Sequence, residues 1–158
     1  MATQGTSDHA RTTILVVENE RAIAALVRRV LEDKGFNVLT ATGWDDAIWV
    51  CESCSTPIQL VLMDVFLAPR QDWSSQHPGV SKGSGTLLAR RLKTIQPRMQ
   101  VIFMSSFVDY LGQFLGALPA DMTLMQKPFK PQTLLDTVHA VLGKLRLAPS
   151  TVPGHCPS

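Results

Sequence analysis

The stretch Leu60-Val61-Leu62-Met63-Asp64 ends a continuous apolar run with a carboxylate. An apolar run of this length is typical of a strand buried on both faces, as in a parallel sheet. Because an isolated buried charge costs several kcal/mol or more, Asp64 must be balanced by a cation or by hydrogen bonds. Apolar runs also precede Glu18-Asn19-Glu20 and Lys127-Pro128. We expect Lys127, and a divalent metal held by the acidic stretch, to be the partners of Asp64.

The composition predicts one globular domain. The chain has 158 residues, of which 45% are hydrophobic and 18% charged, enough for one buried core and too few for two ordinary domains. The formal net charge is +2, with both signs scattered, so neither nucleic acid nor an anionic membrane is predicted as a partner. No apolar stretch approaches the ~20 residues of a membrane span, and the N-terminus lacks the apolar segment of a secretory signal. We therefore expect a cytoplasmic protein.

Three cysteines, at positions 51, 54 and 156, do not form a disulfide framework. Cys51 and Cys54 have the spacing of a redox pair, but an active pair belongs at a helix N-terminus, where the helix dipole lowers the thiol pKa. Here the pair falls at the end of a predicted helix. We therefore expect reduced thiols and disfavour a thiol oxidoreductase.

Between two predicted disordered tails, residues 1–11 and 148–158, strand and helix patterns alternate. Predicted strands cover residues 13–17, 36–40, 58–63, 100–104 and 122–126. Helical spacing predicts helices over 23–31 (closed by Gly35), 44–54, 88–95, 108–115 and 134–145. This (βα)5 pattern predicts an α/β fold: a doubly wound, five-stranded parallel sheet with helices on both faces.

Parallel sheets of this kind bind ligands at the carboxyl ends of their strands. Glu18-Asn19-Glu20 follows the first predicted strand and Asp64 the third; Ser105-Ser106 follows the fourth and Lys127-Pro128 the fifth. All of these groups are therefore predicted to lie along one edge of the sheet.

With these segments in this order, the chain resembles the receiver domain of two-component response regulators over about residues 12–147. The resemblance rests on four segments, Ile14–Glu20, Leu60–Asp64, Val101–Ser105 and Gln126–Phe129. It implies a flavodoxin-like sheet with strand order 2-1-3-4-5.

The resemblance also implies the chemistry. Asp64 would be the phosphoacceptor, attacking a phosphohistidine on a sensor histidine kinase or histidine phosphotransfer protein, with Lys127 and Ser105 contacting phosphoryl oxygens. Mg²⁺, or Mn²⁺ in its place, would be held by Glu18, Asn19, Asp64 and the backbone carbonyl of Phe66. The Lys127–Pro128 peptide bond is expected to be cis. For Ser105, a hydroxyl bonded only to backbone is an open alternative.

Three features depart from the family pattern. Asn19 stands where the family usually has an acid, so we expect weaker metal binding. Glu20 could compensate only if its side chain reaches back to the metal. The favoured role of Glu20 is to complement the dipole of the helix that follows. Leu124 replaces the usual aromatic residue of the switch. Residues 67–83 are predicted to form an irregular insertion. In it, Trp73 is expected either at an interface with another protein or packed on a neighbouring helix. His77 is expected to be a solvent-exposed loop histidine.

Two functions follow. The first is a stand-alone receiver module, with Mg²⁺-dependent self-phosphorylation and autodephosphorylation at Asp64, that signals by altered binding to an unknown downstream protein. The alternative is a receiver-like interaction scaffold that is never phosphorylated, which Asn19 and Leu124 favour. A homodimer through the fourth helix, fifth strand and fifth helix stays open.

Overall fold

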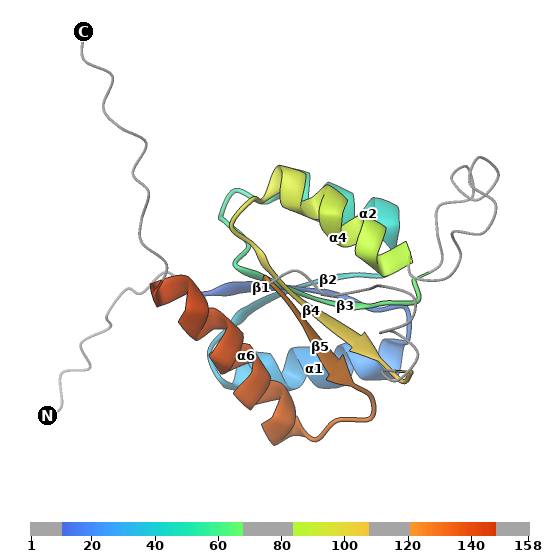
Figure 1. Ribbon diagram of the computed structural model, residues 1–158, viewed down its shortest axis with the longest axis vertical. Helices are drawn as coiled ribbons and strands as arrows, with labels where there is room; N and C mark the ends of the chain where they lie inside the picture. Colours follow the sequence, from blue (N-terminus) through green and yellow to red (C-terminus); the bar gives the residue numbers. More distant parts are fainter. Residues whose placement is uncertain (1–10, 68–83, 108–120, 148–158) are drawn as a thin grey trace, which may run out of the picture.

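The computed structural model describes residues 11–67, 84–107 and 121–147. Their five strands form one parallel sheet, which helices cover on both faces (Figure 1). The strands are β1 (Thr13–Val17), β2 (Asn37–Ala41), β3 (Leu60–Asp64), β4 (Gln100–Ser105) and β5 (Met122–Gln126). Their order is β2-β1-β3-β4-β5, which confirms the predicted fold. The helices are α1 (Arg21–Asp33), α2 (Trp44–Ser53), α4 (Ser84–Ile95) and α6 (Pro131–Leu147).

Strands β1 and β5 have the predicted bounds, and the other three differ by one or two residues. β2 begins at Asn37 because the N–H of Phe36 donates to the carbonyl of Leu31 at the end of α1, instead of joining the sheet. β3 and β4 extend through Asp64 and Ser105. Both of these residues are therefore held by the sheet itself and do not follow it.

Several predictions fall outside the described residues. These are the helix over 108–115, most of the insertion with Trp73 and His77, and the two tails apart from Arg11. In the described part of the chain, no helix has the length and apolar character needed to cross a membrane.

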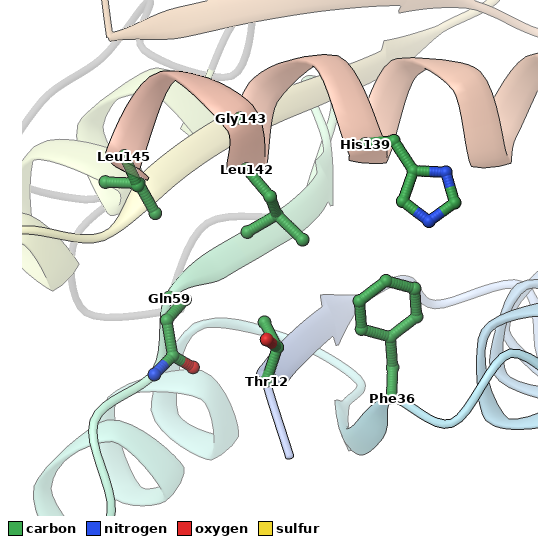
Figure 2. A pocket seen from close by; sticks show the side chains of 7 residues that line it. All are labelled: Thr12, Phe36, Gln59, His139, Leu142, Gly143 and Leu145. Carbon is green, nitrogen blue, oxygen red and sulfur yellow. The ribbon is translucent and has the colours of Figure 1, made fainter. Parts of the chain in front are cut away.

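Helices α1 and α6 cover one face of the sheet (Figure 1). Alternate side chains of β1 and β3, such as Ile14, Val16 and Leu62, point to this face and pack against the apolar sides of both helices. At the amino ends of the strands this layer leaves a cavity of about 370 Å³, where His139 of α6 lies over Phe36 (Figure 2). None of the predicted site residues lines this cavity.

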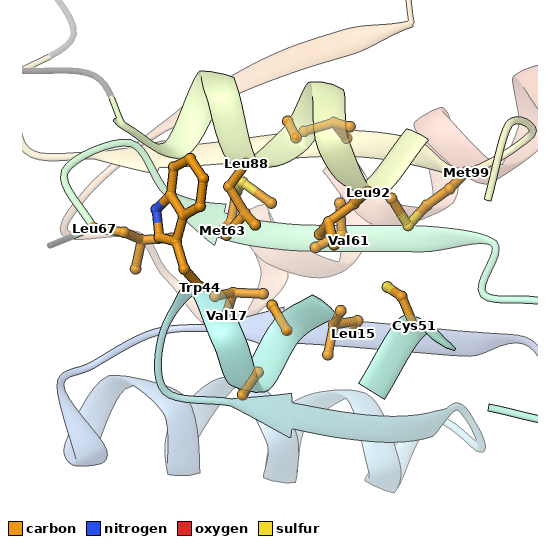
Figure 3. Packing of buried hydrophobic residues seen from close by; sticks show 14 of the residues in the cluster. Leu15, Val17, Trp44, Cys51, Val61, Met63, Leu67, Leu88, Leu92 and Met99 are labelled. Carbon is orange, nitrogen blue, oxygen red and sulfur yellow. The ribbon is translucent and has the colours of Figure 1, made fainter. Parts of the chain in front are cut away.

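Helices α2 and α4 cover the opposite face (Figure 1). Leu15, Val17 and Val61 of the sheet pack against Trp44 of α2 and Leu88 of α4 (Figure 3). With both faces covered, the three inner strands β1, β3 and β4 are buried along most of their length, as their continuous apolar sequences predicted, whereas the edge strands β2 and β5 are only partly buried.

The α2 and α4 face also shows where the insertion meets the core. Leu67 is buried beside Trp44 (Figure 3), so this residue belongs to the core and not to the insertion to which the sequence assigned it. Trp44 and Trp49 lie five residues apart on α2 and therefore on different faces of the helix, and Trp44 is buried whereas Trp49 is exposed.

Two glycines are required where they stand. Gly35 has φ +88°, the left-handed conformation that ends helices, as predicted. Gly85 lies in the first turn of α4, and its N–H donates to the carbonyl of Val65 over 2.9 Å. A Cβ atom at position 85 would lie 2.4 Å from the carbonyl oxygen of Asp64. The absent side chain therefore lets α4 begin against the end of β3.

We predict that Gly85→Ala destabilises the protein by about 1–3 kcal/mol, because the helix or the Asp64–Val65 backbone must move to make room. Urea unfolding measures the loss. Gly143→Ala is the matched control, since a Cβ on this glycine of α6 meets nothing within 4 Å. It should leave the free energy of unfolding unchanged or raise it by up to about 1 kcal/mol. Equal stability of the two variants would contradict this account of Gly85.

Candidate functional site

The carboxyl ends of four strands bring the predicted site residues to one edge of the sheet. Asp64 is the last residue of β3, Ser105 the last of β4, and Glu18 and Lys127 directly follow β1 and β5. Ladder-type hydrogen bonds extend past the strand ends: the N–H of Glu18 donates to Ala41, and that of Lys127 to Ser105. The backbone at these positions is therefore held as firmly as the sheet.

Lys127 joins two carboxylates that are far apart in the sequence. Its Nζ atom lies 2.7 Å from Oε2 of Glu18 and 2.9 Å from Oδ2 of Asp64. The Glu18 side chain is fully buried, and those of Lys127 and Asp64 are 8% and 15% exposed. We call these three side chains the ion triad. The Lys127–Pro128 peptide bond is cis, as expected.

Backbone N–H groups bind the remaining carboxylate oxygens of the ion triad. The N–H of Glu20 donates to Oε1 of Glu18 over 3.1 Å, and the N–H of Phe66 donates to Oδ1 of Asp64 over 2.8 Å. Each carboxylate therefore accepts one hydrogen bond from backbone and one from Lys127. This answers the requirement, set by the sequence, that a carboxylate at the end of a buried strand needs partners.

The ion triad holds Lys127 in its charged form. Burial by itself lowers the pKa of an ammonium group, but the hydrogen bonds to Glu18 and Asp64 outweigh it and raise the pKa of Lys127 above its ordinary value. With Glu18 and Asp64 ionised, two negative charges face one positive charge. The ion triad therefore carries a net charge of −1, which attracts a further cation.

Ser105 is buried, and its Oγ accepts a hydrogen bond from the N–H of Phe107 over 3.0 Å. This is the backbone-bonded arrangement that the sequence left open.

Asn19 and Glu20, between β1 and α1, are both exposed. Glu20 is the N-cap residue of α1, as the helix-dipole interpretation requires, although its side chain makes no capping hydrogen bond.

Sequence reasoning missed an aromatic pair beside the ion triad. Phe66 and Phe107 are exposed, and their rings meet edge to face with centroids 6.0 Å apart. The N–H groups of these two residues bind Asp64 and Ser105, so the pair connects the loops after β3 and β4. The sequence did offer a signal for this pair: Phe66 and Phe107 each come two positions after the polar residue that ends a strand, Asp64 or Ser105.

A cavity of about 300 Å³ opens beside Lys127, between α1 and the start of α6. Ile23, Leu26 and Phe129 form its apolar lining, and Glu20 and Ser106 its polar lining. Leu26 is one of the few large apolar side chains that the described surface exposes. Of the ion triad, Lys127 lines this partly apolar mouth, and Glu18 and Asp64 do not.

The donor atoms at this edge suit a hard divalent cation. Glu18 and Asp64 offer carboxylate oxygens, Asn19 an amide oxygen and Phe66 a backbone carbonyl, which are ligand types that Mg²⁺ and Mn²⁺ accept. Within residues 11–67, 84–107 and 121–147, no group of three His, Cys, Asp or Glu side chains could hold a metal. Amide, carbonyl or water oxygens would thus have to complete the set.

The cysteine pair lies away from this edge, at the end of α2. Cys51 is buried, and burial, followed by the charges of Cys54 and Glu52, raises its pKa to about 11. A thiol of this kind is almost wholly protonated at neutral pH, whereas redox chemistry requires the thiolate. The Cys51 thiol therefore fits the interpretation of this pair as reduced thiols, and both Cys51 and Cys54 are free cysteines.

Comparison with known proteins places the chain in a family. The family model described as response regulator receiver domain matches residues 14–139. The sensor kinase CckA of Brucella abortus is 29% identical over 134 residues, covering 84% of this chain and 13% of that protein. The transcriptional regulatory protein YbdJ of Bacillus subtilis, itself uncharacterised, is 30% identical over 122 residues, covering 77% of this chain and 47% of YbdJ. The chain thus spans half or less of these relatives.

Solved structures agree with the family model. The receiver domain of the hybrid histidine kinase CckA superposes with a TM-score of 0.62 at 25% identity, covering 82% of this chain and 98% of that domain. A response regulator from Thermotoga maritima gives a TM-score of 0.63 at 26% identity, covering 84% of this chain and 98% of that protein. The chain belongs to the response regulator receiver domain family.

Proposed function

We propose that Asp64 accepts a phosphoryl group from a phosphohistidine on a partner protein. A carboxylate oxygen of Asp64 attacks phosphorus, an O–P bond forms, the N–P bond breaks, and the released imidazole nitrogen is left to take up a proton. The observation that carries the proposal is the 2.9 Å contact between Asp64 Oδ2 and the buried ammonium of Lys127.

Lys127 supplies the positive charge that this reaction requires at the acceptor. Phosphoryl transfer spreads negative charge over the phosphoryl oxygens, and catalysis consists mainly of alignment and countercharge. The ammonium already lies against Asp64 and has three N–H donors, so it can donate to an incoming phosphoryl oxygen while its bond to Glu18 holds it in place. In this proposal Glu18 positions Lys127.

Ser105 has a smaller role in the proposal. Its hydroxyl accepts from Phe107, and the hydroxyl hydrogen is left to donate to a phosphoryl oxygen. Such a bond would pull on the loop that carries Phe107. Because Leu124 stands in place of an aromatic switch residue and is partly buried against the α2 and α4 face, we propose that the Phe66–Phe107 side of the site transmits the change.

Mg²⁺, with Mn²⁺ as an alternative, is the proposed cofactor. It would be held by Asp64, Asn19, the carbonyl of Phe66 and, directly or through water, Glu18, and would neutralise phosphoryl oxygen charge. Glu18 already accepts hydrogen bonds through both of its oxygens. Asn19 adds no charge, so this chain offers the metal less negative charge than a site with two adjacent free acids.

The proposed phosphoryl donors are a sensor histidine kinase or a histidine phosphotransfer protein, acting in the cytoplasm. The hybrid histidine kinase among the relatives supports a kinase-linked role. The apolar mouth formed by Ile23, Leu26 and Phe129 offers the surface beside Lys127 on which a donor would dock. The downstream partner would be a protein that distinguishes the two phosphorylation states.

We predict that incubation with acetyl phosphate and Mg²⁺ adds the mass of one phosphoryl group to the wild-type chain and none to Asp64→Asn. Intact-mass spectrometry measures the shift. Asp136→Asn is the matched control, because Asp136 is an exposed acid of α6 whose carboxylate accepts from Gln132, and it should be modified like the wild type. Phosphorylation of Asp64→Asn would contradict the assignment of Asp64. An unmodified wild type would instead favour the scaffold function.

We predict that Asn19→Asp binds Mg²⁺ at least about tenfold more tightly than the wild type. An added charge about 4 Å from a divalent ion contributes roughly 2–8 kcal/mol of gross attraction, of which desolvation offsets most. Isothermal titration calorimetry measures both affinities without any phosphoryl donor. Equal affinities would show that Asn19 lies outside the metal site.

A further inference from the structure

A groove lies between helices α2 and α4, on the face of the sheet opposite α1 and α6. Its volume is about 390 Å³. Trp44, Ile48 and Trp49 line it from α2, and Leu87 and Arg91 line it from α4. None of these residues belongs to the ion triad or to the mouth beside it.

Trp49 is the most exposed large apolar side chain among the described residues, at 65%. An indole at this level of exposure leaves a large apolar area in water. Tryptophan is also, with tyrosine and arginine, enriched among the side chains that dominate protein interfaces. Ile48 and Leu87 continue the apolar surface from Trp49 into the groove. This face therefore has the composition of an interface centre.

The two helices carry opposite charge. Helix α2 has three acids, Asp45, Asp46 and Glu52, and no Lys or Arg. Helix α4 has three bases, Arg90, Arg91 and Lys93, and no acid. Lys93 forms an ion pair with Asp121 of its own chain, while Arg91 lines the groove opposite Asp45 and Glu52. Among the residues that line the groove, Asp45 and Glu52 thus form an acidic wall and Arg91 a basic wall, with apolar side chains between them.

We propose that this groove is the interface of a homodimer, in which α2 of one copy packs on α4 of the other. A two-fold interface uses the same patch on both copies, so the patch must be complementary to itself. Both helices connect strands of one parallel sheet, so they run in the same direction, and they contact each other along the groove. A two-fold axis along the helices therefore places each acidic wall opposite a basic wall.

The charge pattern also selects among arrangements. A two-fold axis perpendicular to the helices would place α2 on α2 and α4 on α4, acid against acid and base against base, which is unfavourable. A partner with one sign of charge would attract one wall and repel the other. A second copy of this chain matches both walls at once, and it covers Trp49 of each copy with α4 of the other.

The test measures self-association of the full chain by sedimentation equilibrium over a range of concentrations. We expect a reversible monomer–dimer equilibrium in the wild type. Arg91→Glu and Glu52→Arg should each weaken dimerisation at least about tenfold, because the two-fold axis repeats every lost contact. The variant with both substitutions should recover most of the affinity. Arg29→Glu, an exposed charge reversal on α1, should behave as the wild type.

Trp49→Ala tests the apolar part of the interface and should also shift the equilibrium to monomer. Circular dichroism checks that each variant is folded. Dimerisation should weaken as salt concentration rises. A wild type that stays monomeric at every concentration overturns the proposal and leaves the groove to another partner. A dimer that all single substitutions leave intact also overturns the proposal. The same holds if the double variant dimerises as weakly as the single variants. Acetyl phosphate labelling of Asp64 does not depend on any of these outcomes.

Discussion

The buried ammonium of Lys127 is the interaction on which this edge of the sheet depends. Two carboxylates, from the ends of β1 and β3, converge on Lys127 at the end of β5, and each also accepts a backbone N–H. Either carboxylate alone would be costly to bury at the end of a buried strand. Together with one lysine they form a satisfied, singly negative group, which in the proposed function receives a cation and a phosphoryl group.

The rest of the molecule keeps that group in place. Helices on both faces bury the strands, so the strand ends are fixed, and Gly85 lets α4 begin directly against the backbone of Asp64 and Val65. The loops after β3 and β4 meet through Phe66 and Phe107. A change at Asp64 or Ser105 therefore reaches an exposed aromatic surface within two residues. The groove between α2 and α4 is a separate surface with its own charge pattern.

Most of the fold could be predicted from the sequence, because five short apolar runs mark the strands and apolar residues at helical spacing mark the four helices between and after them. Their ends were less certain: Phe36 is apolar like its strand, yet its N–H closes α1. The meeting of Glu18, Asp64 and Lys127 followed from strand order. The second hydrogen bond of each carboxylate and the role of Gly85 did not, because they depend on backbone approach that no residue pattern encodes. The spacing of Phe66 and Phe107 from the strand ends was a signal for the aromatic pair, but the edge-to-face contact depends on ring orientation, which the spacing does not give.

One lysine stabilises both carboxylates of the ion triad, and the free energy of unfolding of Lys127→Met tests this most directly. Removing one partner of a buried ionic group typically costs about 3–5 kcal/mol, and we expect a loss of this size at neutral pH without divalent metal. Since the folded state raises the pKa of Lys127, the difference from wild type should persist up to pH 10.5 and shrink above it. A variant as stable as the wild type at neutral pH would contradict the account.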